Sequence, residues 1–216
     1  MNVVIDSVVS QVGGAQQAMR WEKLLRTLAK EMLSEGWKIY CLDRGGAPEI
    51  DGTETYPFPN YRFSEGASDS QLVQKLCDFV SADVFLSGAY TTPLEVPTVQ
   101  ILISGSSSVP KAKEYSVRSN VEKRLALAFS TATICDSEAI GQSLLKFSAI
   151  EARGSPIISP IGWDTIVQPQ GLTQFAQIVM NEIRAVHKLS LTEINQNFRA
   201  KWRRLREIQA SVDVVI

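Results

Sequence analysis

The chain has 216 residues, enough for one domain with a full hydrophobic core, and 44% of them are hydrophobic. Its 22 basic and 23 acidic residues nearly cancel, so the overall charge favours neither nucleic acid nor an anionic membrane as a partner. The first residues contain no basic leader and no long apolar run. We therefore expect a cytoplasmic protein with no signal peptide and no integral membrane segment.

A strand, a glycine turn and a helix open the chain. Asn2 to Val9 form a predicted buried strand, Gly13 and Gly14 lie in the turn, and an apolar stripe predicts a helix over 16–34, with Gly36 as its C-cap. Glycine lets the backbone approach a ligand, and the start of a helix offers free N–H groups to a phosphate, which Arg20 could assist. A tight turn without a ligand, with Arg20 as a solvated charge, is the alternative, because the GxGxxG spacing and a Walker lysine are absent.

Apolar runs and helical stripes then alternate as far as residue 159. The region 43–66 is predicted as a long connection with one short edge strand, and Asp69 or Ser70 as the N-cap of the next helix. This alternation predicts an α/β fold: a single Rossmann-like, doubly wound, mainly parallel sheet with a C-terminal helical appendage. The further strands are expected at 38–42, 54–56, 84–87, 98–103, 132–135 and 157–159, and the further helices at 70–80, 120–129 and 138–146.

Two polar segments follow predicted strands and are candidate ligand sites. Tyr90 and Thr91 come after the strand at 84–87, and Ser104, Gly105 and Ser106 come after the strand at 98–103. Ligands of open α/β sheets lie beyond the carboxyl ends of the strands, so both segments could contact a sugar or a phosphate. Ordinary polar turns remain the alternative, since no base is available to activate the serines.

The three cysteines and the single histidine limit the chemistry. Cys41 and Cys135 fall in predicted strands and Cys77 in a predicted helix, without a CxxC pair, so we expect buried, reduced thiols. His187 stands alone in a late amphipathic helix, which excludes histidine-based triads and multi-histidine metal sites. We therefore expect no metal and no cofactor, and any acid–base chemistry would use carboxylates, tyrosine or the substrate.

The character of the chain changes after residue 159. We expect a Rossmann-like domain over 1–164, followed by a linker and helices over 165–216 that pack on this domain or on a partner. Apolar stripes containing Phe175, Phe198 and Trp202 make these three residues the expected interface of a homodimer. The last helix also carries basic residues from Arg199 to Arg206, which are either solvated or contact an acidic partner or the periphery of an anionic membrane.

The order of these motifs resembles the amino-terminal domain of GT-B glycosyltransferases, particularly the large family-four group. In that family this domain binds the acceptor, and its glycine turn faces the donor diphosphate, a role that the resemblance assigns to Gly13 and Gly14. The resemblance covers about three quarters of the chain. It is carried by Gly13-Gly14, Arg20-Trp21-Glu22, Leu42-Asp43-Arg44-Gly45-Gly46, Tyr90-Thr91-Thr92-Pro93, Asp136-Ser137-Glu138 and the segment from Ile158 to Asp164.

The chain departs from the family in two respects. The nucleotide-sugar-binding domain is missing, and the tail over 172–208 looks like the final helices that cross back onto the first domain. Ser104-Gly105 also stand where many members place a histidine-aspartate or tyrosine-aspartate pair near the reacting sugar, although the transition state needs placed charge.

The resemblance implies a transferase component. It would be the acceptor-side half of a truncated glycosyltransferase-like enzyme, which transfers a sugar from a nucleotide sugar to a hydroxyl acceptor with a separate donor-binding partner and without metal. The isolated chain would be inactive, because proximity catalysis needs both reactants held together. Two alternatives remain open: a catalytically inactive remnant that acts as a binding, regulatory or homo-oligomeric module, and an unrelated small-ligand enzyme on a Rossmann-like sheet.

Overall fold

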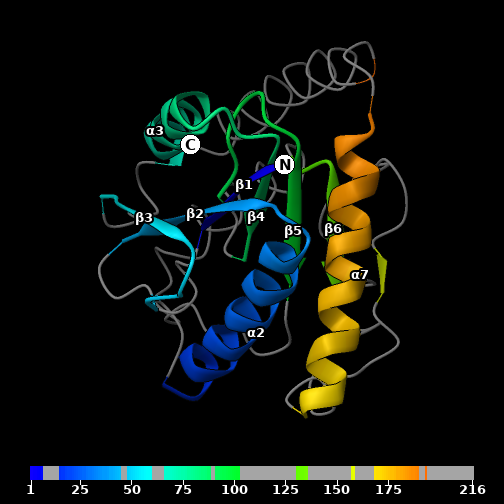
Figure 1. Cartoon of the computed structure of the whole chain (residues 1–216). Coiled ribbons are helices and arrows are strands. Elements are labelled where there is room, and N and C mark those ends of the chain that lie inside the picture. Colours follow the sequence, from blue (N-terminus) through cyan, green and yellow to red (C-terminus); the bar gives the residue numbers. More distant parts are fainter. Residues whose placement is uncertain are drawn as a thin grey trace, which may run out of the picture.

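A seven-stranded parallel sheet forms the centre of the molecule (Figure 1). The computed structural model describes residues 1–6, 15–44, 48–59, 66–88, 91–102, 130–135, 157–158, 168–189 and 193. Every neighbouring pair of strands is parallel, in the order β3-β2-β1-β4-β5-β6-β7. The strands are β1 (Asn2–Asp6), β2 (Lys38–Asp43), β3 (Glu54–Pro57), β4 (Val84–Ser87), β5 (Thr98–Leu102), β6 (Ala132–Cys135) and β7 (Ile157–Ile158).

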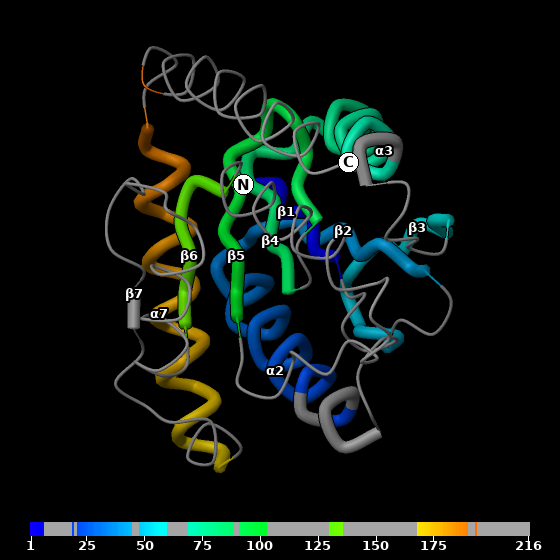
Figure 2. Tube along the Cα trace, turned by 180° about the vertical axis from the view of Figure 1, so that it is seen from behind, coloured from blue at the N-terminus to red at the C-terminus, as the bar shows by residue number. Residues whose placement is uncertain are grey.

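The described helices cover both faces of this sheet. Helices α2 (Ala15–Ser34) and α7 (Pro169–His187) stand side by side on one face, and α3 (Gly66–Phe79) packs on the other (Figures 1 and 2). The sheet therefore has two apolar cores, and its central strands β1, β4 and β5 are buried on both sides, as is typical of a doubly wound parallel sheet. The predicted α/β, Rossmann-like fold is confirmed.

Helix α2 forms because its sequence is rich in good helix formers and carries one apolar stripe. Trp21, Leu24, Leu28 and Met32 on this stripe are buried against the sheet. The predicted C-cap, Gly36, has a φ of 76°, which a glycine adopts without steric cost. Its N–H donates to the carbonyl of residue 33, and the next N–H donates to the carbonyl of Met32, which is a Schellman motif.

Helix α3 begins earlier than the sequence predicts. Asp69 and Ser70 have side chains suited to an N-cap, but the helix starts at Gly66, so both lie inside its first turns. The Asp69 carboxylate accepts hydrogen bonds from Arg44 instead of capping the helix. A long-range ion pair thus takes the side chain that local sequence assigns to a cap.

Helix α7 belongs to the core of this domain. Phe175, expected at a homodimer interface, is fully buried on the face that α7 shares with α2, because the sheet itself covers the α7 stripe. That expectation is wrong for Phe175, whereas Phe198 and Trp202 lie outside the described residues. Polar contacts also join the two helices: Arg184 donates to the Glu35 carboxylate, and Gln177 donates to Glu31 at 3.4 Å.

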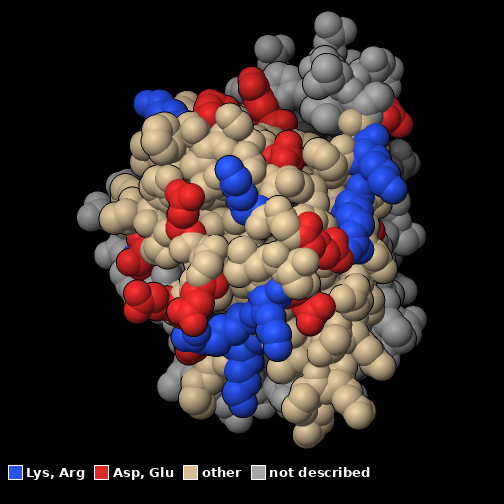
Figure 3. Space-filling view, in the orientation of Figure 1, with Lys and Arg blue, Asp and Glu red and all other residues tan. Residues whose placement is uncertain are grey.

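On the described part of the two-helix face, groups of basic side chains have acidic side chains beside them. Basic and acidic side chains lie next to one another over α2 and α7 (Figure 3). Within the described ranges, no helix combines the length and apolar character needed to cross a membrane. The basic segment from Arg199 to Arg206 lies outside these ranges.

Candidate functional site

The strand order reverses between β1 and β4, and this point defines the candidate site. Strands β2 and β3 extend the sheet on one side of β1, whereas β4 to β7 extend it on the other. In open parallel sheets, ligands lie beyond the carboxyl ends of the strands at such a reversal, because the two flanking connections diverge there. The relevant side chains are therefore those at the ends of β1, β2, β4 and β5.

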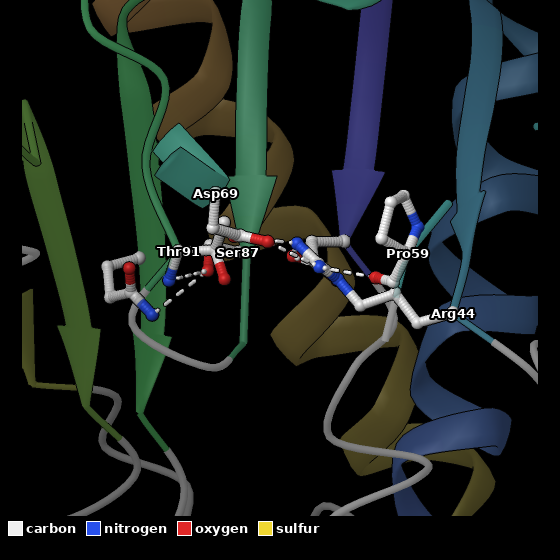
Figure 4. Close-up of polar contacts among 7 residues, drawn as sticks. Arg44, Pro59, Asp69, Ser87 and Thr91 are labelled. Carbon is white, nitrogen blue, oxygen red and sulfur yellow. Dashed lines mark hydrogen bonds and ion pairs between the residues drawn. The ribbon is translucent and has the colours of Figure 1, made fainter. Parts of the chain in front are cut away.

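Arg44, directly after β2, is enclosed by hydrogen-bond acceptors at this edge. Its Nε and Nη2 groups donate to the Asp6 carboxylate, and Nη2 lies 2.9 Å from Asp6 Oδ2. Nη1 and Nη2 donate to the two Asp69 oxygens at 2.7 and 2.9 Å, and Nη1 also donates to the carbonyl of Pro59 at 3.0 Å (Figure 4). The ring of Phe58 covers the guanidinium, with its centroid 4.7 Å from Cζ. All five N–H donors of the guanidinium are thus satisfied.

The Arg44 cluster, formed by Asp6, Arg44 and Asp69, contains two carboxylates around one guanidinium. Burial alone would lower the pKa of Arg44. The charge of Asp6 and the hydrogen bonds to Asp69 and Asp6 together raise this pKa by more than burial lowers it, so the guanidinium stays protonated. Burial raises the pKa of Asp69 above its ordinary value, although Arg44 acts in the opposite direction. The cluster ties β1, β2 and α3 together, and its guanidinium is already occupied by carboxylates.

A row of polar side chains crosses the sheet next to this cluster. Asp6 on β1 is in register with Ser87 on β4, Ser87 with Gln100 on β5, and Gln100 with Thr133 on β6. Side chains in register on parallel strands point to the same face, so the row lies on the face that α3 partly covers. Buried strands of a parallel sheet are ordinarily apolar on both faces, which makes this row unusual.

Ser87 Oγ is the acceptor at the middle of the row. The backbone N–H of Thr91 donates to it at 3.2 Å, and Gln100 Nε2 donates to it at 3.3 Å. Both donors come from buried residues, so Ser87 joins the segment after β4 to Gln100 in the middle of β5. Figure 4 shows Ser87 and Thr91 beside Arg44 and Asp69 at the tips of the strands.

Three buried polar atoms among the described residues have no hydrogen-bond partner. They are Trp21 Nε1, Thr91 Oγ1 and Gln100 Oε1. Thr91 and Gln100 both belong to the network around Ser87, and the Trp21 ring lies against Gly88, the next residue. The three atoms therefore belong to residues that contact the carboxyl end of β4.

Gly88 has no side chain because Trp21 occupies the space. A Cβ atom on Gly88 would lie 1.7 Å from Trp21 Cζ2, far closer than any van der Waals contact. Trp21 is itself buried on α2, so its ring is not free to swing into solvent. Glycine at this position thus lets α2 pack directly under the end of β4.

The structure describes few of the predicted ligand residues. Thr91 is buried at the site, and Arg20 lies on α2, although its side chain is not described. The remaining ones lie outside the described residues: Gly13, Gly14, Tyr90, Ser104, Gly105 and Ser106. Their roles remain predictions.

From the sequence, Asp6, Arg44, Asp69 and Gln100 are not expected at a ligand site: Asp69 is predicted only as a helix cap, and Arg44 only as part of a motif. Two signals point to three of them in retrospect: Asp6 ends one apolar strand and Arg44 directly follows the neighbouring one, and Gln100 lies between apolar residues in β5. A polar residue within a run that is predicted to be buried needs a partner or a function. The predicted buried thiols are confirmed, since Cys41, Cys77 and Cys135 are all buried cysteines. Across the described ranges, no group of three or more His, Cys, Asp or Glu residues is arranged to hold a metal.

Strand order and side chains together define a Rossmann-like α/β domain with a candidate ligand site at its topological switch point. No known protein family matches the sequence, and no curated protein matches it. Among solved structures, the chain is similar to UDP-glucose 4-epimerase from the hyperthermophilic eubacterium Thermotoga maritima, determined with UDP-glucose, with 10% identity and a TM-score of 0.34. The match covers 88% of this chain and 53% of the epimerase, so the chain spans about half the length of that protein.

Proposed function

We propose that this chain is the acceptor-side half of a glycosyltransferase-like enzyme. In this proposal it holds a hydroxyl acceptor at the carboxyl ends of β1, β4 and β5, and a separate protein supplies the nucleotide sugar. The observation that carries the proposal is the set of neutral polar side chains at the switch point, Ser87, Thr91 and Gln100, which lie next to the Arg44 cluster.

The charge of this lining favours an alcohol over a diphosphate. Sites for phosphate use free N–H donors and positive charge. At this edge Arg44 is surrounded by Asp6 and Asp69, so the cluster has more negative than positive groups. Ser87, Thr91 and Gln100 offer hydroxyl and amide groups, which match the hydrogen-bonding pattern of a sugar hydroxyl.

A second protein is part of the proposal because one domain supplies only one wall of a cleft. Sugar transfer requires the donor and the acceptor to be held in contact.

The second candidate function, an inactive binding module, is favoured by α7. This helix completes the apolar core on the sheet, with Phe175 and Ile183 fully buried, so the described part has a closed core without a second domain.

Reconstitution tests the proposal against the binding module. The full-length chain is purified from its native host, copurifying proteins are identified by mass spectrometry, and each is produced separately. Radiolabelled UDP-, GDP- and ADP-sugars are then offered to each protein alone and to the recombined pair, with the host's small-molecule and lipid extracts as acceptors. Transfer by the pair but by neither protein alone supports the proposal. Turnover by the isolated chain, or a stable pair that never transfers, refutes it.

A further inference from the structure

Two unpartnered polar atoms next to Ser87, at the end of β4, need a physical explanation. Leaving a buried donor or acceptor without a partner costs about 1–3 kcal/mol, so folded proteins contain few such groups. Thr91 is 3% exposed and Gln100 is 0% exposed, yet Thr91 Oγ1 and Gln100 Oε1 have no partner. Trp21 Nε1 is also unpartnered, but α2 covers the opposite face of the sheet from Ser87 and Gln100, so this atom does not belong to their site. Unsatisfied groups that gather at a topological switch point are typical of a site that a ligand completes.

The positions of Thr91 and Gln100 are fixed by bonds that they do make. Thr91 N–H and Gln100 Nε2 both donate to Ser87 Oγ, at 3.2 and 3.3 Å. Covalent geometry then places each unpartnered oxygen within about 7 Å of Ser87 Oγ, so both lie around the same hydroxyl group. Turning the Gln100 amide over does not remove the problem, because its nitrogen then loses the bond to Ser87.

The free atoms define the chemistry of the ligand. Gln100 Oε1 only accepts hydrogen bonds, whereas the Thr91 hydroxyl both donates and accepts. An alcohol group can donate a hydrogen bond to Gln100 Oε1 and can exchange hydrogen bonds with the Thr91 hydroxyl. An ionised phosphate has no hydrogen to donate to Gln100 Oε1. The neighbouring Arg44 cluster has two carboxylates and one guanidinium, so it repels an anionic ligand. This repulsion is stronger in a buried site than in water.

We infer that Ser87, Thr91 and Gln100 form a subsite that binds hydroxyl groups of a neutral sugar. This inference rests on the proposed function and makes it more specific: the sugar is the acceptor, and the phosphate-bearing donor lies elsewhere. Ser87 holds Thr91 and Gln100 in place, and these two residues hydrogen-bond the sugar. In the free protein the two unpartnered oxygens of this subsite lower the folding stability, and the bound sugar supplies their missing hydrogen bonds.

A matched pair of threonine substitutions tests this effect on stability. Thr91→Val removes only the unpartnered hydroxyl and keeps the shape and the backbone bond to Ser87. Thr98→Val removes a hydroxyl from a fully buried threonine whose Oγ1 donates to the carbonyl of Val96 at 3.2 Å. We expect Thr91→Val to leave the melting temperature unchanged or higher, and Thr98→Val to lower it.

Binding is measured on the full-length protein by saturation-transfer NMR. The probes are the methyl glycosides of glucose, galactose and mannose, with inorganic phosphate as the charged comparison in a competition experiment. At least one glycoside should bind wild type, phosphate should not displace it, and Thr91→Val should weaken it by about tenfold, the effect of one lost hydrogen bond. Thr98→Val should bind like wild type.

Several outcomes overturn the inference. A lower melting temperature for Thr91→Val means that a bound water already satisfies the hydroxyl. Binding of no glycoside, displacement by phosphate, or equal binding by Thr91→Val and wild type also refutes the subsite. The proposed function fails separately: glycoside binding that depends on Thr91 without any transfer by a reconstituted pair leaves the subsite intact, and transfer that Thr91→Val does not affect leaves the enzyme half intact.

Discussion

Replacing Arg44 with methionine removes the guanidinium from the Arg44 cluster and keeps a side chain of similar length. The substitution eliminates every hydrogen bond that Arg44 makes to Asp6, to Asp69 and to the carbonyl of Pro59. The Asp6 side chain is 0% exposed and the Asp69 side chain 8% exposed, so water does not replace these bonds. Two carboxylates are then left buried without their cation.

The expected loss in the free energy of unfolding is about 3–5 kcal/mol, the usual result of removing one partner from a buried ion pair. For a chain of this length, that loss corresponds to a fall in melting temperature of about 10 °C. The loss should also depend on pH. Burial already raises the pKa of Asp69, and removing Arg44 takes away the group that opposes this effect. The folded variant then holds more protons than the unfolded chain above about pH 4, so its stability falls as the pH rises from there towards neutrality.

Urea unfolding followed by circular dichroism, at pH values from 4 to 8, measures both effects. Arg26→Met is the matched control, because Arg26 pairs with Glu22 on the surface of α2 with about half of its side chain exposed. Its loss should stay below about 1 kcal/mol, as for other exposed pairs. Equal losses for the two variants, or a loss for Arg44→Met that does not change with pH, would refute the assignment of Arg44 as a buried structural tie.

Three further changes probe the packing. Gly88→Ala should destabilise by about 1–3 kcal/mol in urea unfolding, because its Cβ overlaps the Trp21 ring, and the loss should shrink when Trp21→Leu is added. Phe175→Ala should destabilise by about 3–5 kcal/mol in the same assay, since Phe175 fills the core under α7. Burial raises the pKa of Cys77 to about 12 and also raises that of Cys41, so iodoacetamide at pH 8 should label neither thiol until the protein is unfolded, as followed by mass spectrometry.

Each of these expectations has a control. Gly36→Ala places a side chain at a φ of 76° in open space, so its loss of about 1–2 kcal/mol comes from backbone strain and Trp21→Leu should not relieve it. Phe79→Ala, at a residue that is 75% exposed, should cost far less than Phe175→Ala. Rescue of Gly36→Ala by Trp21→Leu, equal losses for the two phenylalanines, or rapid labelling of native Cys77 would contradict the packing described above.

The strands were within reach of sequence reasoning because their signal is local. Two predicted strands, 84–87 and 132–135, match β4 and β6 to the residue, and the edge strand predicted at 54–56 is β3 with one more residue. Short apolar runs separated by polar turns are sufficient to indicate buried parallel strands. The 3.6-residue stripe and Gly36 likewise predict both the existence and the end of α2.

The site was much less accessible because its bonds join distant parts of the chain. Arg44 pairs with Asp6, 38 residues away, and with Asp69, 25 residues away. No residue pattern specifies these partners, so Asp69 looks like a helix cap until the fold is known. The apolar stripe that contains Phe175 shows the same difficulty. Such a stripe predicts that the residue is buried, but the sequence does not say whether this domain or a partner buries it.

The pairing of α2 with α7 also has a consequence for synthesis of the chain. Gln177 contacts a residue 146 positions earlier, so the parts of α2 and of the sheet that α7 covers stay uncovered until α7 has been synthesised. A chain that stops before α7 therefore leaves the apolar surface under this helix without its cover.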